Sequence, residues 1–73
     1  MMFKTFLKTY ESDDLMESDF INDARGQSRF PNVKSEMQLT SYLNGRRACS
    51  EAVNAGKRLW KKYQAELNSE LLV

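Results

Sequence analysis

The fold is decided by Asn44–Leu67, NGRRACSEAVNAGKRLWKKYQAEL, an uninterrupted stretch that lacks proline and contains the only tryptophan of the chain. Its apolar residues recur at positions i, i+3, i+4 and i+7, which places them on one side of a helix. They are Cys49, Ala52, Val53, Gly56, Leu59, Trp60, Tyr63 and Leu67. The pattern predicts a long amphipathic helix whose apolar side, including Cys49, is buried and in which Gly56 permits the close approach of a neighbouring helix.

The opposite side of this predicted helix is basic. It carries six of the eleven lysine and arginine residues of the chain, with Glu51 as the one acid among them. The six are Arg46, Arg47, Lys57, Arg58, Lys61 and Lys62. Such a face can contact nucleic-acid phosphates or an acidic protein, with Arg25 and Arg29 adding charge from a neighbouring loop, or it can be an ordinary solvated helix surface.

The N-terminal part of the chain has the opposite charge. Residues 1–24 contain six acidic residues and only two lysines, although the net charge of the whole chain is +1. The acidic and basic halves can complement each other within one molecule, or they can present opposite poles to partners or to another copy of the chain.

A short first helix is predicted over residues 2–10. Its apolar residues again follow the i, i+3, i+4, i+7 spacing; they are Phe3, Phe6, Leu7 and Tyr10. A helix this short is not stable alone in water, so it must be held by packing against the rest of the chain.

The second predicted helix covers residues 14–25. Asp14 and Glu17 match a capping box at its start, and Gly26 is a plausible stop at its end. The residues expected to face inward are Leu15 or Met16, Phe20, Ile21 and Ala24, and those expected to face solvent are Glu17, Asp19 and Asp23.

A loop and a third helix connect this segment to the long one. Because Pro31 disfavours helical dihedrals at Phe30, residues 27–34 are expected to form a loop in which Phe30 folds back over the core or remains an exposed contact residue. Ser35 and Gln38 match a second capping box, which starts a helix over residues 35–44. Gly45 then lets the chain reverse into the long helix, 46–68. The tail, 71–73, extends the apolar side, docks on the bundle or projects from it.

These elements predict a single all-α domain, 1–73: a compact bundle of three short helices packed around one long C-terminal helix. With 73 residues the core is thin, and the free energy of unfolding is expected to be on the order of 4–10 kcal/mol.

The order of residues resembles a known family. The pattern runs Phe3-x-x-Phe6-Leu7-x-x-Tyr10, Phe20-x-x-x-Ala24, Phe30-Pro31, Tyr42-Leu43 and Leu59-Trp60-x-x-Tyr63. It is similar to that of the YozE-like small proteins of Gram-positive bacteria and their phages. The resemblance implies a sterile-alpha-motif-like helical fold and no assigned function. The basic long helix departs from the family, whose members tend to be acidic.

The sequence argues against an enzyme. It contains no histidine, no glycine-rich phosphate loop and no nucleophile with a neighbouring base, so we expect no catalytic residues, cofactor or metal. The acidic pairs Asp13/Asp14 and Asp19/Asp23 are interpreted as solvated surface. Trp60, which can stack bases in other settings, has the spacing of a core residue.

Two functions are therefore expected, both without catalysis. In the first, the protein is a small binding module whose basic helix face contacts nucleic-acid phosphates without reading sequence, or an acidic protein surface. In the second, it is a protein interaction or self-association module that uses its acidic and basic poles and binds no nucleic acid. No membrane association or small-molecule substrate is expected, and the single cysteine fits a cytoplasmic location, bacterial or in the host of a phage.

Overall fold

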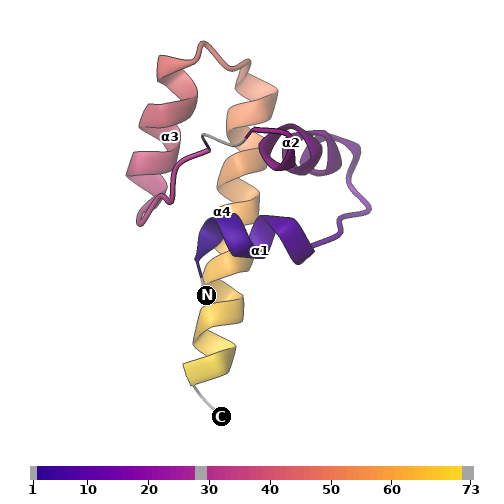
Figure 1. Ribbon diagram of the computed structural model, residues 1–73, viewed down its shortest axis with the longest axis vertical. Helices are drawn as coiled ribbons and strands as arrows, with labels where there is room; N and C mark the ends of the chain where they lie inside the picture. Colours follow the sequence, from indigo (N-terminus) through magenta and orange to yellow (C-terminus); the bar gives the residue numbers. More distant parts are fainter. Residues whose placement is uncertain (1, 28–29, 72–73) are drawn as a thin grey trace.

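The computed structural model describes residues 2–27 and 30–71, without the side chains of the last two of these. This part of the chain forms four helices and no strand: α1 (Phe3–Thr9), α2 (Leu15–Arg25), α3 (Glu36–Gly45) and α4 (Ser50–Leu71). In Figure 1, α4 runs along the longest axis, and the three shorter helices surround its first half while its C-terminal turns project beyond them. The predicted all-α architecture is confirmed.

Two helices begin at the predicted caps. The Asp14 carboxylate accepts a hydrogen bond of 3.0 Å from the backbone N–H of Glu17, and the Ser35 hydroxyl accepts one of 3.1 Å from the N–H of Gln38. The second half of each capping box differs from the standard motif, because the Gln38 amide oxygen accepts from the N–H of Lys34 and the Glu17 side chain turns toward α4. The sequence signals therefore fix where α2 and α3 start.

The turn between α3 and α4 differs from the prediction. Gly45 does not have a positive φ and is the last residue of α3, whereas Arg47 adopts the left-handed conformation, with φ 59°. The N–H of Ala48 donates to the carbonyl of Leu43, and that of Arg47 donates to the carbonyl of Asn44. This is a Schellman motif in which arginine occupies the position that usually holds glycine.

Because of this turn, α4 begins at Ser50 and not at 46. The prediction that Cys49 is buried is wrong: Cys49 precedes the helix and is exposed, so its place on a helical wheel had no physical meaning. Ala55, which was not predicted to face the core, is fully buried.

The core is aromatic and is centred on Phe3 of α1. The Phe3 ring lies 5.0 Å from the Trp60 ring and 5.4 Å from the Tyr63 ring, centroid to centroid. Phe30 is buried and its ring contacts the Tyr42 ring edge-on at 5.4 Å, which confirms the expectation that the loop aromatic folds back over the core. Favourable ring geometries of this kind add to the stabilisation from burial alone.

At Gly56, side chains of α2 and α3 pack closely against the backbone of α4. A Cβ atom at this position would lie 3.0 Å from Leu43 Cδ1 and 3.1 Å from Phe20 Cε2. The predicted role of Gly56 in close helix packing is confirmed, and the contacts place Phe20 between α2 and the start of α4.

Three alternative positions are predicted for the tail, 71–73. It falls outside the described residues except for the backbone of Leu71, where α4 ends.

Candidate functional site

A cluster of four charged residues joins the start of α2 to the middle of α4. Glu17 is buried, with 3% of its surface exposed, and its carboxylate accepts hydrogen bonds from Arg58 Nε at 3.1 Å and from Lys62 Nζ at 2.6 Å. The Ser12 hydroxyl donates to the same carboxylate at 3.2 Å. Asp14 lies 3.5 Å from Arg58 Nη2 and completes the cluster. Two acids and two bases therefore compensate each other within the molecule.

The protonation behaviour of the cluster follows from these contacts. Burial raises the pKa of Glu17, but the hydrogen bonds from Lys62 and Arg58 outweigh burial and hold it below the ordinary value of 4.5. The pKa of Asp14 is lowered chiefly by the backbone N–H of Glu17, and that of Lys62 is raised chiefly by its hydrogen bond to Glu17. All three groups are charged at neutral pH.

The cluster shows that the predicted position of Glu17 is wrong, and it gives two of the predicted contact residues partners within the molecule. Glu17 was expected to face solvent, and it is instead the buried acid that ties α2 to α4, because two cations satisfy its carboxylate there. Arg58 and Lys62, expected to form part of a contact face, make internal ion pairs while remaining 46% and 43% exposed. Here the acidic and basic halves complement each other within one molecule.

The other four predicted contact residues lie in two separate places. Arg46 and Arg47 belong to the turn before α4, so the six bases do not share one helix face. Arg46 donates to the Tyr42 hydroxyl at 3.0 Å and to the Gln27 amide oxygen, and its guanidinium lies over the Tyr42 ring. This arginine ties the α3–α4 turn to the loop that follows α2.

Lys57 and Lys61 form the remaining pair, one turn apart on α4. Lys57 is half-buried and Lys61 is exposed, and neither makes an ion pair within the described part of the chain. Arg25, which was expected to add charge, donates to the backbone carbonyls of Leu7 and Tyr10 and so caps the end of α1. Arg29 lies outside the described residues.

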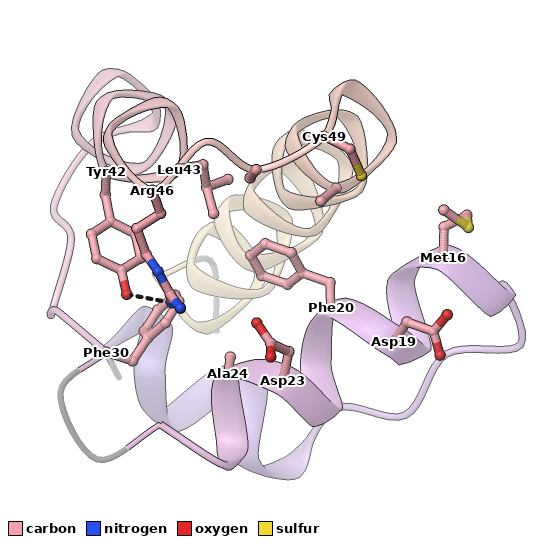
Figure 2. A pocket seen from close by; sticks show the side chains of 12 residues that line it. Met16, Asp19, Phe20, Asp23, Ala24, Phe30, Tyr42, Leu43, Arg46 and Cys49 are labelled. Atoms are coloured by element: carbon pink, nitrogen blue, oxygen red, sulfur yellow. Dashed lines mark hydrogen bonds between the residues drawn. The ribbon is translucent and has the colours of Figure 1, made fainter.

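A groove of about 350 Å³ lies between α2, the α3–α4 turn and the first turn of α4. Figure 2 shows Met16, Asp19, Asp23 and Ala24 along the α2 side, with the Phe20 ring projecting from α2 toward α4. The facing side comes from α3, the turn and α4. Its lining residues are Tyr42, Leu43, Arg46, Ala48, Cys49 and Ala52, with Phe30 at one end. We call this feature the α2–α4 groove.

The α2–α4 groove is apolar inside and charged along its rim. Asp19 and Asp23 are exposed and lie one turn apart on α2. Asp23 accepts a hydrogen bond from the Gln27 amide nitrogen at 3.2 Å, whereas no ion pair reaches either carboxylate in the part of the chain described here. Among the described residues that line the groove, Arg46 is the one with a cationic side chain. Such a groove can hold an apolar side chain of a ligand, with a cationic group of the same ligand near the carboxylates.

Sequence reasoning missed this groove. Asp19 and Asp23 were correctly expected to be exposed, but nothing in their spacing indicated that they border an apolar surface. The groove exists because the Schellman turn delays the start of α4 and places Cys49 and Ala48 across from α2. A turn of this kind needs a residue with positive φ, and glycine usually indicates that position in a sequence. Here the position holds Arg47, so the sequence gives no such indication.

The four helices form a small all-α domain. The family model described as YozE SAM-like fold matches residues 3–65, and the chain belongs to this family. The match confirms the resemblance seen in the sequence and the sterile-alpha-motif-like fold. Neither the comparison with curated proteins nor that with solved structures gave a significant match.

Two properties of the described residues bear on the class of site. They contain no group of three or more acidic, cysteine or histidine side chains placed to hold a metal ion. No helix among them combines the length and the apolar character needed to cross a membrane.

Proposed function

We propose that this protein is a non-enzymatic interaction module that binds a segment of another protein in the α2–α4 groove. The observation that carries the proposal is the groove itself: apolar side chains from α2, α3 and α4 surround about 350 Å³ of open space at the surface. Grooves of this kind bind an apolar side chain of a partner, with polar groups at the rim fixing its orientation.

The charges favour a protein partner over a nucleic acid. Arg58 and Lys62 are compensated by Glu17 and Asp14, which lowers the positive potential that phosphates would meet on this side of α4. The rim of the groove carries two exposed aspartates, which repel a phosphate backbone. Binding at the groove is therefore best matched by a polypeptide.

The internal pairing also bears on self-association. Head-to-tail contact between acidic and basic poles needs unpaired charge of both signs, and Asp14 and Glu17 already pair with Arg58 and Lys62 in one molecule. This pairing removes four charges from the two poles. It leaves Asp19, Asp23, Lys57 and Lys61 without ion pairs among the described residues, so pole-to-pole assembly would have fewer charges to use than the sequence indicates.

A display library of short random peptides tests the proposal. The full chain is used as bait in two forms, one with the Cys49 thiol free and one with it alkylated by a bulky maleimide, because Cys49 is the only cysteine and lines the groove. We expect enrichment of peptides with an apolar anchor that lose binding when Cys49 is alkylated. Failure to enrich any peptide, or equal binding to both baits, would contradict the proposal.

A second candidate function, contact with nucleic-acid phosphates, is favoured by one observation. Lys57 and Lys61 lie one turn apart on α4, and neither takes part in the ion pairs of the described residues. Titration of a short fluorescent DNA duplex at several salt concentrations tests this candidate. It is supported if Lys57→Glu with Lys61→Glu abolishes binding that weakens with salt, and it fails if the parent protein does not bind at low salt.

A further inference from the structure

We infer that the segment bound in the α2–α4 groove carries a lysine or arginine next to its apolar anchor, and that this cation is bound by Asp19 and Asp23. The inference rests on the proposed function and adds the chemistry of the partner. It follows from how the acids of α2 are used, from the position of Arg46 at the groove, and from the apolar surface of the groove.

The acids of α2 and its cap fall into two groups. Asp14 and Glu17, at the start of the helix, are ion-paired with α4. Asp19 and Asp23, farther along, are exposed and have no cationic partner within the described residues. The acids at the start of α2 are therefore paired with α4, whereas Asp19 and Asp23, at the edge of the groove, have no ion pair with a described residue.

Arg46 does not compensate Asp19. In Figure 2, Arg46 lies at the end of the groove with Tyr42 and Phe30, whereas Asp19 lies toward the opposite end, near Met16. The guanidinium of Arg46 is engaged by Tyr42 and Gln27, and Gln27 in turn donates to Asp23. A cation brought by a partner is thus best placed at the Asp19 end, within reach of both carboxylates.

The apolar surface near Asp19 suits the anchor of such a segment. Met16 and Phe20 on α2 lie across the groove from Cys49, and Ala52 of α4 also lines it. Methionine adapts its shape to different apolar side chains, and the small Ala52 leaves room for one. A leucine or phenylalanine inserted here would place the residues beside it next to the aspartates. The partner is therefore a basic, amphipathic segment.

Two matched peptides test the inference: one has a central leucine flanked by lysines, and the other has the same leucine flanked by glutamates. Binding is followed in ¹⁵N–¹H spectra of the full chain through Met16, Phe20 and Ala52. We expect the lysine peptide to bind roughly three- to tenfold more tightly than the glutamate peptide, as exposed ion pairs provide, with the difference shrinking at high salt.

The double variant Asp19→Asn with Asp23→Asn should bind both peptides about equally. The matched control is Asp13→Asn, because Asp13 is also exposed but does not line the groove, and it should retain the preference. Equal binding of the two peptides to the parent protein overturns the inference and leaves the proposed function standing. If neither peptide shifts the groove signals, the proposed function itself fails. Concentration-dependent shifts of the same signals without peptide would identify a second copy as the occupant and overturn the inference.

Discussion

Lys62 on α4 donates a hydrogen bond of 2.6 Å to the buried carboxylate of Glu17 on α2, 45 positions earlier in the chain. The same carboxylate accepts from Arg58, so one buried acid holds two cations of α4. Two of the charges that look like a contact surface in the sequence are thereby used to join two helices, and the proposed contact surface is a different one, the α2–α4 groove.

Replacing Glu17 with glutamine should lower the free energy of unfolding by about 1–3 kcal/mol. The loss is smaller than for a fully enclosed ion pair, since Arg58 and Lys62 are partly exposed and water can solvate them once the carboxylate charge is gone. Urea unfolding followed by circular dichroism measures the change. Asp13→Asn, an exposed acid beside the cluster, is the control and should shift the midpoint little. An unchanged midpoint for Glu17→Gln would show that the cluster does not stabilise the fold.

Stability should fall in acid because of the same cluster. The ordinary pKa values are 4.5 for Glu17 and 3.8 for Asp14, and folding lowers both. Below these values the folded state binds fewer protons than the unfolded state, so protonation favours unfolding. The stabilisation is fully present well above pH 4.5 and is lost as the pH falls through the lowered values. Urea midpoints across this range should decline less steeply for Glu17→Gln than for the parent, and parallel curves would contradict the assignment.

Two substitutions in the α3–α4 turn, Arg47→Gly and Gly45→Ala, should each increase the stability of the protein. Arg47 has a φ of 59°, a conformation that costs about 1 kcal/mol or more for a residue other than glycine, so Arg47→Gly should stabilise by about that amount. Gly45 has no positive φ, and a Cβ there meets nothing within 4 Å, so Gly45→Ala should add about 0.5–1 kcal/mol. Thermal unfolding of each variant and of the pair measures these gains. Destabilisation by Gly45→Ala would mean that Gly45, and not Arg47, makes the turn.

Cys49 should react with a thiol reagent in the folded protein. Its exposure before the first residue of α4 makes the sulfur accessible without unfolding. Titration with Ellman's reagent in native buffer should give one thiol per chain at a rate similar to that in denaturant. Reaction only after denaturant is added would restore the prediction that Cys49 is part of the core.

Periodicity predicted the buried aromatic residues of the helices but missed Ala55. Phe3 and Trp60 are buried, as their spacing indicated, because a helix with apolar residues at i, i+3, i+4 and i+7 packs against a bundle with that apolar side inward. The same rule contained the signal for Glu17, which was missed. Glu17 stands at i, i+3, i+4 and i+7 with Phe20, Ile21 and Ala24, so its position is at the centre of the inward side. Glu17 was predicted to face solvent because it is charged. Its partners Arg58 and Lys62 are too far away in the sequence for its pattern to indicate an ion pair.

The groove was not predictable in the same way. Its position depends on where α4 starts, and that depends on a left-handed arginine in place of the glycine that normally marks such a turn. Because α4 starts at Ser50 and not at residue 46, Arg46 is not part of the helix and Cys49 lies exposed opposite α2. A helical wheel applied across that boundary could describe neither the basic surface nor the groove.

The central claim is that the binding surface is the α2–α4 groove and not the basic side of α4. It is tested most directly by recording ¹⁵N–¹H spectra of the full chain with the lysine-flanked leucine peptide and, separately, with a short DNA duplex at low salt. We predict that the peptide shifts the signals of Met16, Phe20 and Ala52, which line the groove, and that the duplex does not. Shifts at Lys57 and Lys61 with the duplex, together with unchanged groove signals in the presence of the peptide, would contradict the claim.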